Sequence, residues 1–80
     1  MAVVHFSSSQ LQYTGGVERV TVEAHRVREL LIGLGRRFPG LDEELARMAV
    51  AIDGTIHQDA EFERLAPDAE IYFVPRTAGG

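Results

Sequence analysis

The residues with the most distinctive chemistry form the C-terminal run Ala78-Gly79-Gly80. Two glycines bring no side-chain bulk, so the terminal carboxylate of Gly80 can enter a narrow channel in another protein. A carboxylate is unreactive until it becomes an acyl-adenylate, from which a sulfur nucleophile can displace the nucleotide and leave a thiocarboxylate. We therefore predict that Gly80 is the adenylated, sulfur-carrying group and that Ala78 and Gly79 thread the tail into a partner.

Activation of this carboxylate requires ATP, and the sequence contains neither a glycine-rich phosphate loop nor a dinucleotide-binding fingerprint. We expect the chain to bind no cofactor itself, and we expect a partner enzyme to use the ATP. On this interpretation the protein has no catalytic residue of its own. It is the substrate of an activating enzyme rather than an enzyme.

Histidines are the only side chains that suggest a metal site, because the chain has no cysteine. The three histidines, His5, His25 and His57, lie on separate expected elements without the spacing of metal ligands. Without a thiol, a site built on sulfur is also excluded. We predict no metal site.

Serines and clustered carboxylates are weaker candidates for catalysis. Residues 7–9 are three serines, but no Gly-x-Ser-x-Gly elbow or oriented base accompanies them, so they are typical of a loop. Residues 42–44 and 61–63 carry paired carboxylates, and we interpret both groups as solvated helix faces rather than as acid–base catalysts.

Length, charge and hydrophobic pattern restrict the class of protein. Eighty residues can build one domain, and 45% hydrophobic residues suit a globular fold. The net charge of −4 argues against nucleic acid, whose phosphates need a cationic face. No apolar run approaches the roughly 18 residues that span a membrane, and the N-terminus lacks the features of a signal peptide. We expect a cytoplasmic protein.

The first half of the chain predicts a hairpin followed by a helix. Residues 3–6 and 17–22 are β-rich, and Gly15-Gly16 between them indicates a turn. Apolar residues then recur at helical spacing over 27–38, and Pro39-Gly40 ends that pattern. The expected start of this helix carries no Ser, Thr or Asp cap.

The second half predicts a short helix and three strands. Residues 41–48 favour the helix, residues 49–52 and 55–57 favour strands, and Asp53-Gly54 between them is typical of a type I′ turn. Residues 61–65 suggest one helical turn, and residues 70–74 form the last strand. Connection lengths allow the first and last strands to lie side by side in the sheet. The sequence thus predicts an α+β, β-grasp (ubiquitin-like) fold, with one main helix packed across a mixed five-stranded sheet. Residues 1–76 would form this domain, and residues 77–80 a flexible tail.

Several motifs resemble the sulfur-carrier family that includes the small subunit of molybdopterin synthase (MoaD) and the thiamine-pathway carrier (ThiS). They are Gly15-Gly16 before Val20-Thr21-Val22-Glu23, Val27-Arg28-Glu29-Leu30-Leu31, Arg37-Phe38-Pro39, Val50-Ala51-Ile52-Asp53-Gly54, Leu65-Ala66-Pro67-Asp68-Ala69-Glu70, Phe73-Val74-Pro75 and Ala78-Gly79-Gly80. The resemblance implies adenylation of Gly80 by an enzyme related to ubiquitin activation, followed by sulfur transfer and delivery to an acceptor. It also implies that an exposed face near Phe73, Pro75 and Arg76 docks the partner.

Among these carriers the chain looks most like the molybdopterin synthase subunit, which implies the synthase large subunit as sulfur acceptor in cofactor biosynthesis. Two departures leave this acceptor open: Arg76-Thr77 precedes the Ala-Gly-Gly ending, and residues 7–12 lack the Leu-Arg-Glu type of segment. Carriers for thiamine, cysteine synthesis, tRNA thiolation or secondary metabolism are alternatives. So are a ubiquitin-like modifier that conjugates to lysine and an interaction module whose diglycine is incidental.

Overall fold

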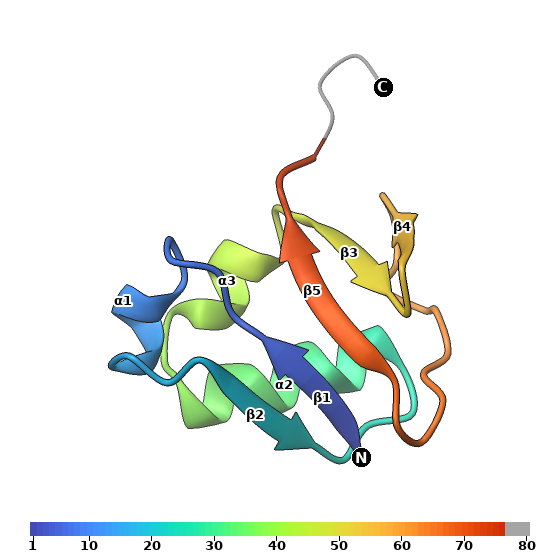
Figure 1. Cartoon of the computed structure of the whole chain (residues 1–80), viewed down its shortest axis with the longest axis horizontal. Helices are drawn as coiled ribbons and strands as arrows, with labels where there is room; N and C mark the ends of the chain where they lie inside the picture. Colours follow the sequence, from blue (N-terminus) through green and yellow to red (C-terminus); the bar gives the residue numbers. More distant parts are fainter. Residues whose placement is uncertain (77–80) are drawn as a thin grey trace.

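A five-stranded mixed sheet with three helices makes up the computed structural model, which describes residues 1–76 (Figure 1). Along the chain the elements are β1 (Ala2–His5), α1 (Leu11–Thr14), β2 (Arg19–Val22), α2 (Val27–Arg37), α3 (Leu41–Leu45), β3 (Ala49–Ile52), β4 (Thr55–His57) and β5 (Glu70–Val74). The strand order is β2-β1-β5-β3-β4. The expected α+β, β-grasp fold is confirmed.

The first and last strands lie side by side in the sheet, as their connection lengths suggested. β1 pairs with β5 in parallel, with Val3 opposite Glu70 and His5 opposite Tyr72. Two antiparallel pairs, β1–β2 and the hairpin β3–β4, complete the sheet, and β3 runs antiparallel to β5. In the turn between β3 and β4, Asp53 and Gly54 have φ of 48° and 88°. Both values are positive, as a type I′ turn requires.

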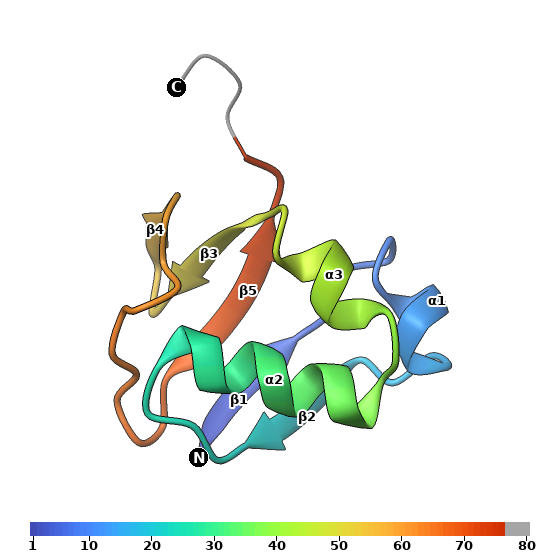
Figure 2. The same ribbon diagram turned by 180° about the vertical axis from the view of Figure 1, so that it is seen from behind.

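One face of the sheet is covered by helices, with α2 lying across it and α3 beside it (Figure 2). The buried stripe of α2 is Val27, Leu30 and Leu34, and it belongs to one core cluster with Val4 and Ile71 of the sheet. Burying each such side chain contributes about 1.5–3 kcal/mol. Within residues 1–76 the opposite face carries no helix (Figure 1). No helix in this part of the chain has the length and apolar character to cross a membrane.

Backbone groups far along the chain satisfy the start of α2, which explains its missing side-chain cap. The N–H groups of Val27 and Arg28 donate to the carbonyls of Glu63 and Glu61, at 3.1 and 2.9 Å. The Glu29 carboxylate accepts from the N–H of His25 at 2.8 Å. Because the first N–H groups of a helix have no partner within the helix, the bonds of Val27 and Arg28 replace a cap.

This capping arrangement also explains one wrong prediction. Residues 61–65 form no helical turn. The N–H of Glu63 donates to the carbonyl of Ala60 in a tight turn, and Arg64 forms an isolated antiparallel β-bridge with Arg26 through the backbone. The segment passes the start of α2, and its carbonyls accept hydrogen bonds from the first N–H groups of that helix instead of forming a helical turn. Other elements also differ from expectation. α1 falls in the stretch treated as loop and turn, and β2 begins at Arg19 rather than at residue 17. α3 ends at Leu45 rather than at residue 48, and β1 is shifted by one residue from the expected range 3–6.

Gln10 is a fully buried polar side chain between β1 and α1. Pairing of β1 with β5 ends at Tyr72, and the Gln10 amide donates to the next carbonyl of β5, that of Phe73, at 3.2 Å. The Gln10 side-chain oxygen accepts from the N–H of Ser7 at 3.0 Å. This side chain therefore substitutes for strand pairing at the point where β1 leaves the sheet.

We predict that Gln10→Leu lowers the free energy of unfolding by about 2–4 kcal/mol, because it leaves a buried carbonyl and an N–H without partners. Gln12→Leu is the matched control, since Gln12 is exposed and should change stability by less than about 0.5 kcal/mol. Urea denaturation measures both variants. Equal midpoints for Gln10→Leu and the wild type would show that the buried amide is not needed.

Candidate functional site

The C-terminal end of β5 is the part of the fold that presents the predicted tail. Val74 ends the strand, and Pro75 and Arg76 follow it as exposed residues beyond the sheet (Figure 1). Ala78, Gly79 and Gly80 lie outside the described residues, as does the expected tail 77–80. The roles assigned to them from the sequence stay predictions.

The prediction of an exposed docking face at Phe73 is wrong, because this side chain is buried. It is only 3% exposed and belongs to the core cluster. Tyr72, its neighbour on β5, is 50% exposed. Successive strand residues point to opposite faces, and Glu70 marks the solvent side, so Tyr72 shares that side while Phe73 points to the helices. The charge of Glu70 is the sequence signal that could have assigned this alternation.

The open face of the sheet carries a row of side chains that centres on Tyr72. Tyr72 is opposite His5 of β1 and Ala51 of β3, and Ala51 is in turn opposite Ile56 of β4. Directly opposed residues share a face. Tyr72 and Ile56, 50% and 59% exposed, are thus apolar residues on one surface with the small Ala51 between them.

His5 is held in place on this face by two contacts. Its ring stacks on Tyr72 with centroids 4.6 Å apart, and its Nε2 lies 2.6 Å from the carboxylate of Glu70. His25 and His57 lie elsewhere, before α2 and on β4. Within residues 1–76, no three potential metal-ligating side chains come together.

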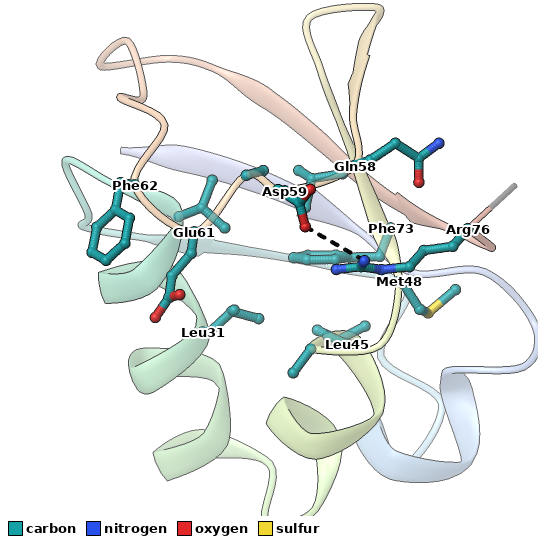
Figure 3. A pocket seen from close by; sticks show the side chains of 13 residues that line it. Leu31, Leu45, Met48, Gln58, Asp59, Glu61, Phe62, Phe73 and Arg76 are labelled. Atoms are coloured by element: carbon teal, nitrogen blue, oxygen red, sulfur yellow. Dashed lines mark ion pairs between the residues drawn. The ribbon is translucent and has the colours of Figure 1, made fainter. Parts of the chain in front are cut away.

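A cavity of about 350 Å³ opens on the other side of β5, between α2, α3, β3 and the segment that follows β4 (Figure 3). Its apolar wall consists of Val27, Leu31, Leu45, Met48, Val50, Ala60 and Phe73. Polar or exposed residues form its remaining lining: Ala46, Gln58, Asp59, Glu61, Phe62 and Arg76. Arg76 therefore connects this cavity with the point where the tail begins.

An ion pair lies beside the cavity at the start of the tail. The Arg76 guanidinium is 3.5 Å from the Asp59 carboxylate, with the two side chains 46% and 91% exposed (Figure 3). Exposed pairs of this length contribute little, because water screens the charges and both side chains lose freedom on pairing. Arg76 can therefore exchange Asp59 for another carboxylate at small cost.

We predict that Asp59→Asn changes the free energy of unfolding by less than about 1 kcal/mol, because the pair is solvated. Urea denaturation at low and high salt measures the effect, and Asp68→Asn, at an exposed turn away from the cavity, is the matched control. A clearly larger loss for Asp59→Asn than for the control would show that the pair holds the fold together.

Comparisons with known proteins agree with this geometry. The model of the ThiS family matches residues 4–80. A crystal structure of the Amycolatopsis orientalis BexX/CysO complex contains a chain that superposes with a TM-score of 0.86 at 17% identity, with 100% of both chains covered. Mycobacterium tuberculosis CysO, described as an antigen, superposes with a TM-score of 0.84 at 13% identity over 96% of this chain and 100% of that one. No curated protein matches the sequence significantly.

Proposed function

The chain belongs to the ThiS family, a family of ubiquitin-like sulfur carriers, and from this membership we propose that it carries sulfur on the C-terminal carboxylate of Gly80. The observation that carries the proposal is the extent of the family match, which runs through the β-grasp domain to residue 80 and so includes Ala78-Gly79-Gly80. The exposed end of β5, with Pro75 and Arg76, supports it, because the tail starts at the surface.

The reaction takes place in two balanced steps. The Gly80 carboxylate attacks the α-phosphate of ATP, which forms the acyl-adenylate and releases pyrophosphate. A sulfur nucleophile such as hydrosulfide then attacks the acyl carbon, the carbon–sulfur bond forms and AMP leaves. The product is a thiocarboxylate. Because the sequence has no phosphate-binding loop, a ubiquitin-activating-type adenylyltransferase binds the ATP, and this chain is its substrate.

A complex with another protein is part of this proposal, as in the BexX/CysO crystal structure. For the sulfur acceptor, the motifs shared with the molybdopterin synthase small subunit favour the synthase large subunit. The two CysO structures favour a second candidate, in which the sulfur goes to an acceptor of the kind that CysO serves. The Arg76-Thr77 segment departs from the molybdopterin pattern and therefore counts against the first candidate.

We predict that intact-protein mass spectrometry detects a gain of about 16 Da, one oxygen replaced by sulfur, after incubation with an activating enzyme, ATP and sulfide. Deletion of Gly80 should abolish this gain and leave the thermal unfolding midpoint unchanged. Each enzyme used must first be shown to charge its own carrier. A gain retained in the deletion variant, or no gain with several active enzymes, contradicts the proposal.

A protein modifier would use the same tail, and a different measurement distinguishes it from a sulfur carrier. It would produce covalent adducts between Gly80 and lysines of other proteins, visible on denaturing gels of cells expressing the chain. A carrier produces the mass gain without such adducts. Adducts that depend on Gly80 and appear without a thiocarboxylate would favour the modifier.

A further inference from the structure

We propose that the cavity beside Arg76 receives an apolar side chain of the activating enzyme and thereby anchors the carrier while its tail is adenylated. This inference rests on the proposed function and adds a binding site to it. The cavity lies on the helix side of β5, whereas the sequence pointed to an exposed surface at Phe73 itself.

The small number of residues between the cavity and the reacting carboxylate favours the activating enzyme as the occupant. Arg76 lines the cavity, and Gly80 is only four positions further along the chain. Four extended residues span about 13 Å. An enzyme that holds the Gly80 carboxylate in its active site must therefore bring its surface close to Arg76. The cavity falls within the area that such an enzyme covers.

Size and lining favour an aliphatic or aromatic group. The cavity volume is about 350 Å³, and Leu31, Leu45, Met48 and Phe73 supply much of its apolar wall (Figure 3). Apolar cavities of about 150 Å³ already accept a benzene ring. Transfer of one large apolar side chain from water into such a site is favourable in proportion to the area buried.

The charges around the cavity offset one another. Arg76 lies 3.5 Å from Asp59, and Arg28 lies 4.0 Å from Glu61, so two cations accompany two anions. An apolar group can then enter without leaving an unpaired charge in a dry contact. Phe62 adds an aromatic side chain that is 63% exposed and lines the same cavity. Such exposed aromatics are enriched at protein–protein contacts.

Two other assignments fit less well. The chain's own tail, Thr77-Ala78-Gly79-Gly80, contains no large apolar side chain that could fill the cavity. The open sheet face has Tyr72 and Ile56, but the cavity that reaches Tyr72 is lined also by His5, Glu18 and Arg19, so it suits an apolar group less well. An apolar side chain from the activating enzyme is the occupant that both the lining and the position of the tail favour.

Ala46 offers a way to block the cavity without removing a core side chain. It lines the cavity, is exposed, and has φ −63° and ψ −19°, a conformation that larger residues adopt freely. Ala46→Phe should therefore place a ring in the cavity, where the apolar side chain of the enzyme would bind. Ala66→Phe is the matched control, because Ala66 is exposed, lies before the start of β5 and does not line the cavity.

The test is carrier-dependent ATP–pyrophosphate exchange by an activating enzyme that charges the wild-type chain. We expect Ala46→Phe to raise the KM for the carrier about tenfold or more and to leave kcat at saturation unchanged, since an anchoring contact of this kind affects binding. Ala66→Phe should keep both constants. Thermal unfolding of each variant verifies that it is folded, and Ala46→Leu replaces Ala46→Phe if the larger ring destabilises the domain.

The outcomes of this test distinguish a failure of the anchoring cavity from a failure of the proposed sulfur-carrier function. If the wild type is charged and the Ala46 variants keep the wild-type KM, the sulfur-carrier function stands and the anchoring cavity is wrong. If no active enzyme charges the wild type, the proposed function fails and the inference fails with it. A loss of kcat at unchanged KM would also overturn the anchoring role.

Discussion

The parallel pairing of β1 with β5 is the constraint on which the rest of the structure depends. Parallel strands cannot be joined by a tight turn and need a long connection. Because β1 and β5 are the first and last elements of the described chain, that connection contains the other elements. The pairing keeps β5 between β1 and β3, with Ile71 and Phe73 turned toward the helices. The strand that precedes the tail is thereby held on both sides, and the tail starts from a rigid base.

The segment after β4 couples the main helix to the start of the tail. Carbonyls of Glu61 and Glu63 accept from the first N–H groups of α2, and the same segment forms one wall of the cavity. Its Asp59 pairs with Arg76 after β5. A stretch without regular structure thus replaces a helix cap, lines the cavity and contacts Arg76, which precedes the tail.

The two sides of β5 present different surfaces to a partner. On the open face, Tyr72 is exposed and stacks on His5, which in turn contacts Glu70, so that surface is partly charged. On the helix side, Phe73 contributes to an apolar cavity. Successive side chains of a strand point to opposite faces, so no single residue of β5 lies on both surfaces. Both surfaces adjoin the end of β5, where a partner that binds the tail can contact them.

The sequence by itself determined the elements with strong local signals: the apolar stripe of α2, the Asp53-Gly54 turn, the central position of the first and last strands, and the family resemblance of the motifs. These depend on residues close together in the chain, or on the burial of one stripe against one sheet face. Only the tertiary structure decided that Gln10 completes β5, that residues 61–63 cap α2, and that Phe73 is buried beside a cavity reached by Arg76. The contacts of Gln10 and of residues 61–63 join positions more than thirty apart, and no local pattern encodes such a pairing. The charge of Glu70 could have assigned the face of Phe73, but the cavity beside it is formed by segments that only the fold brings together.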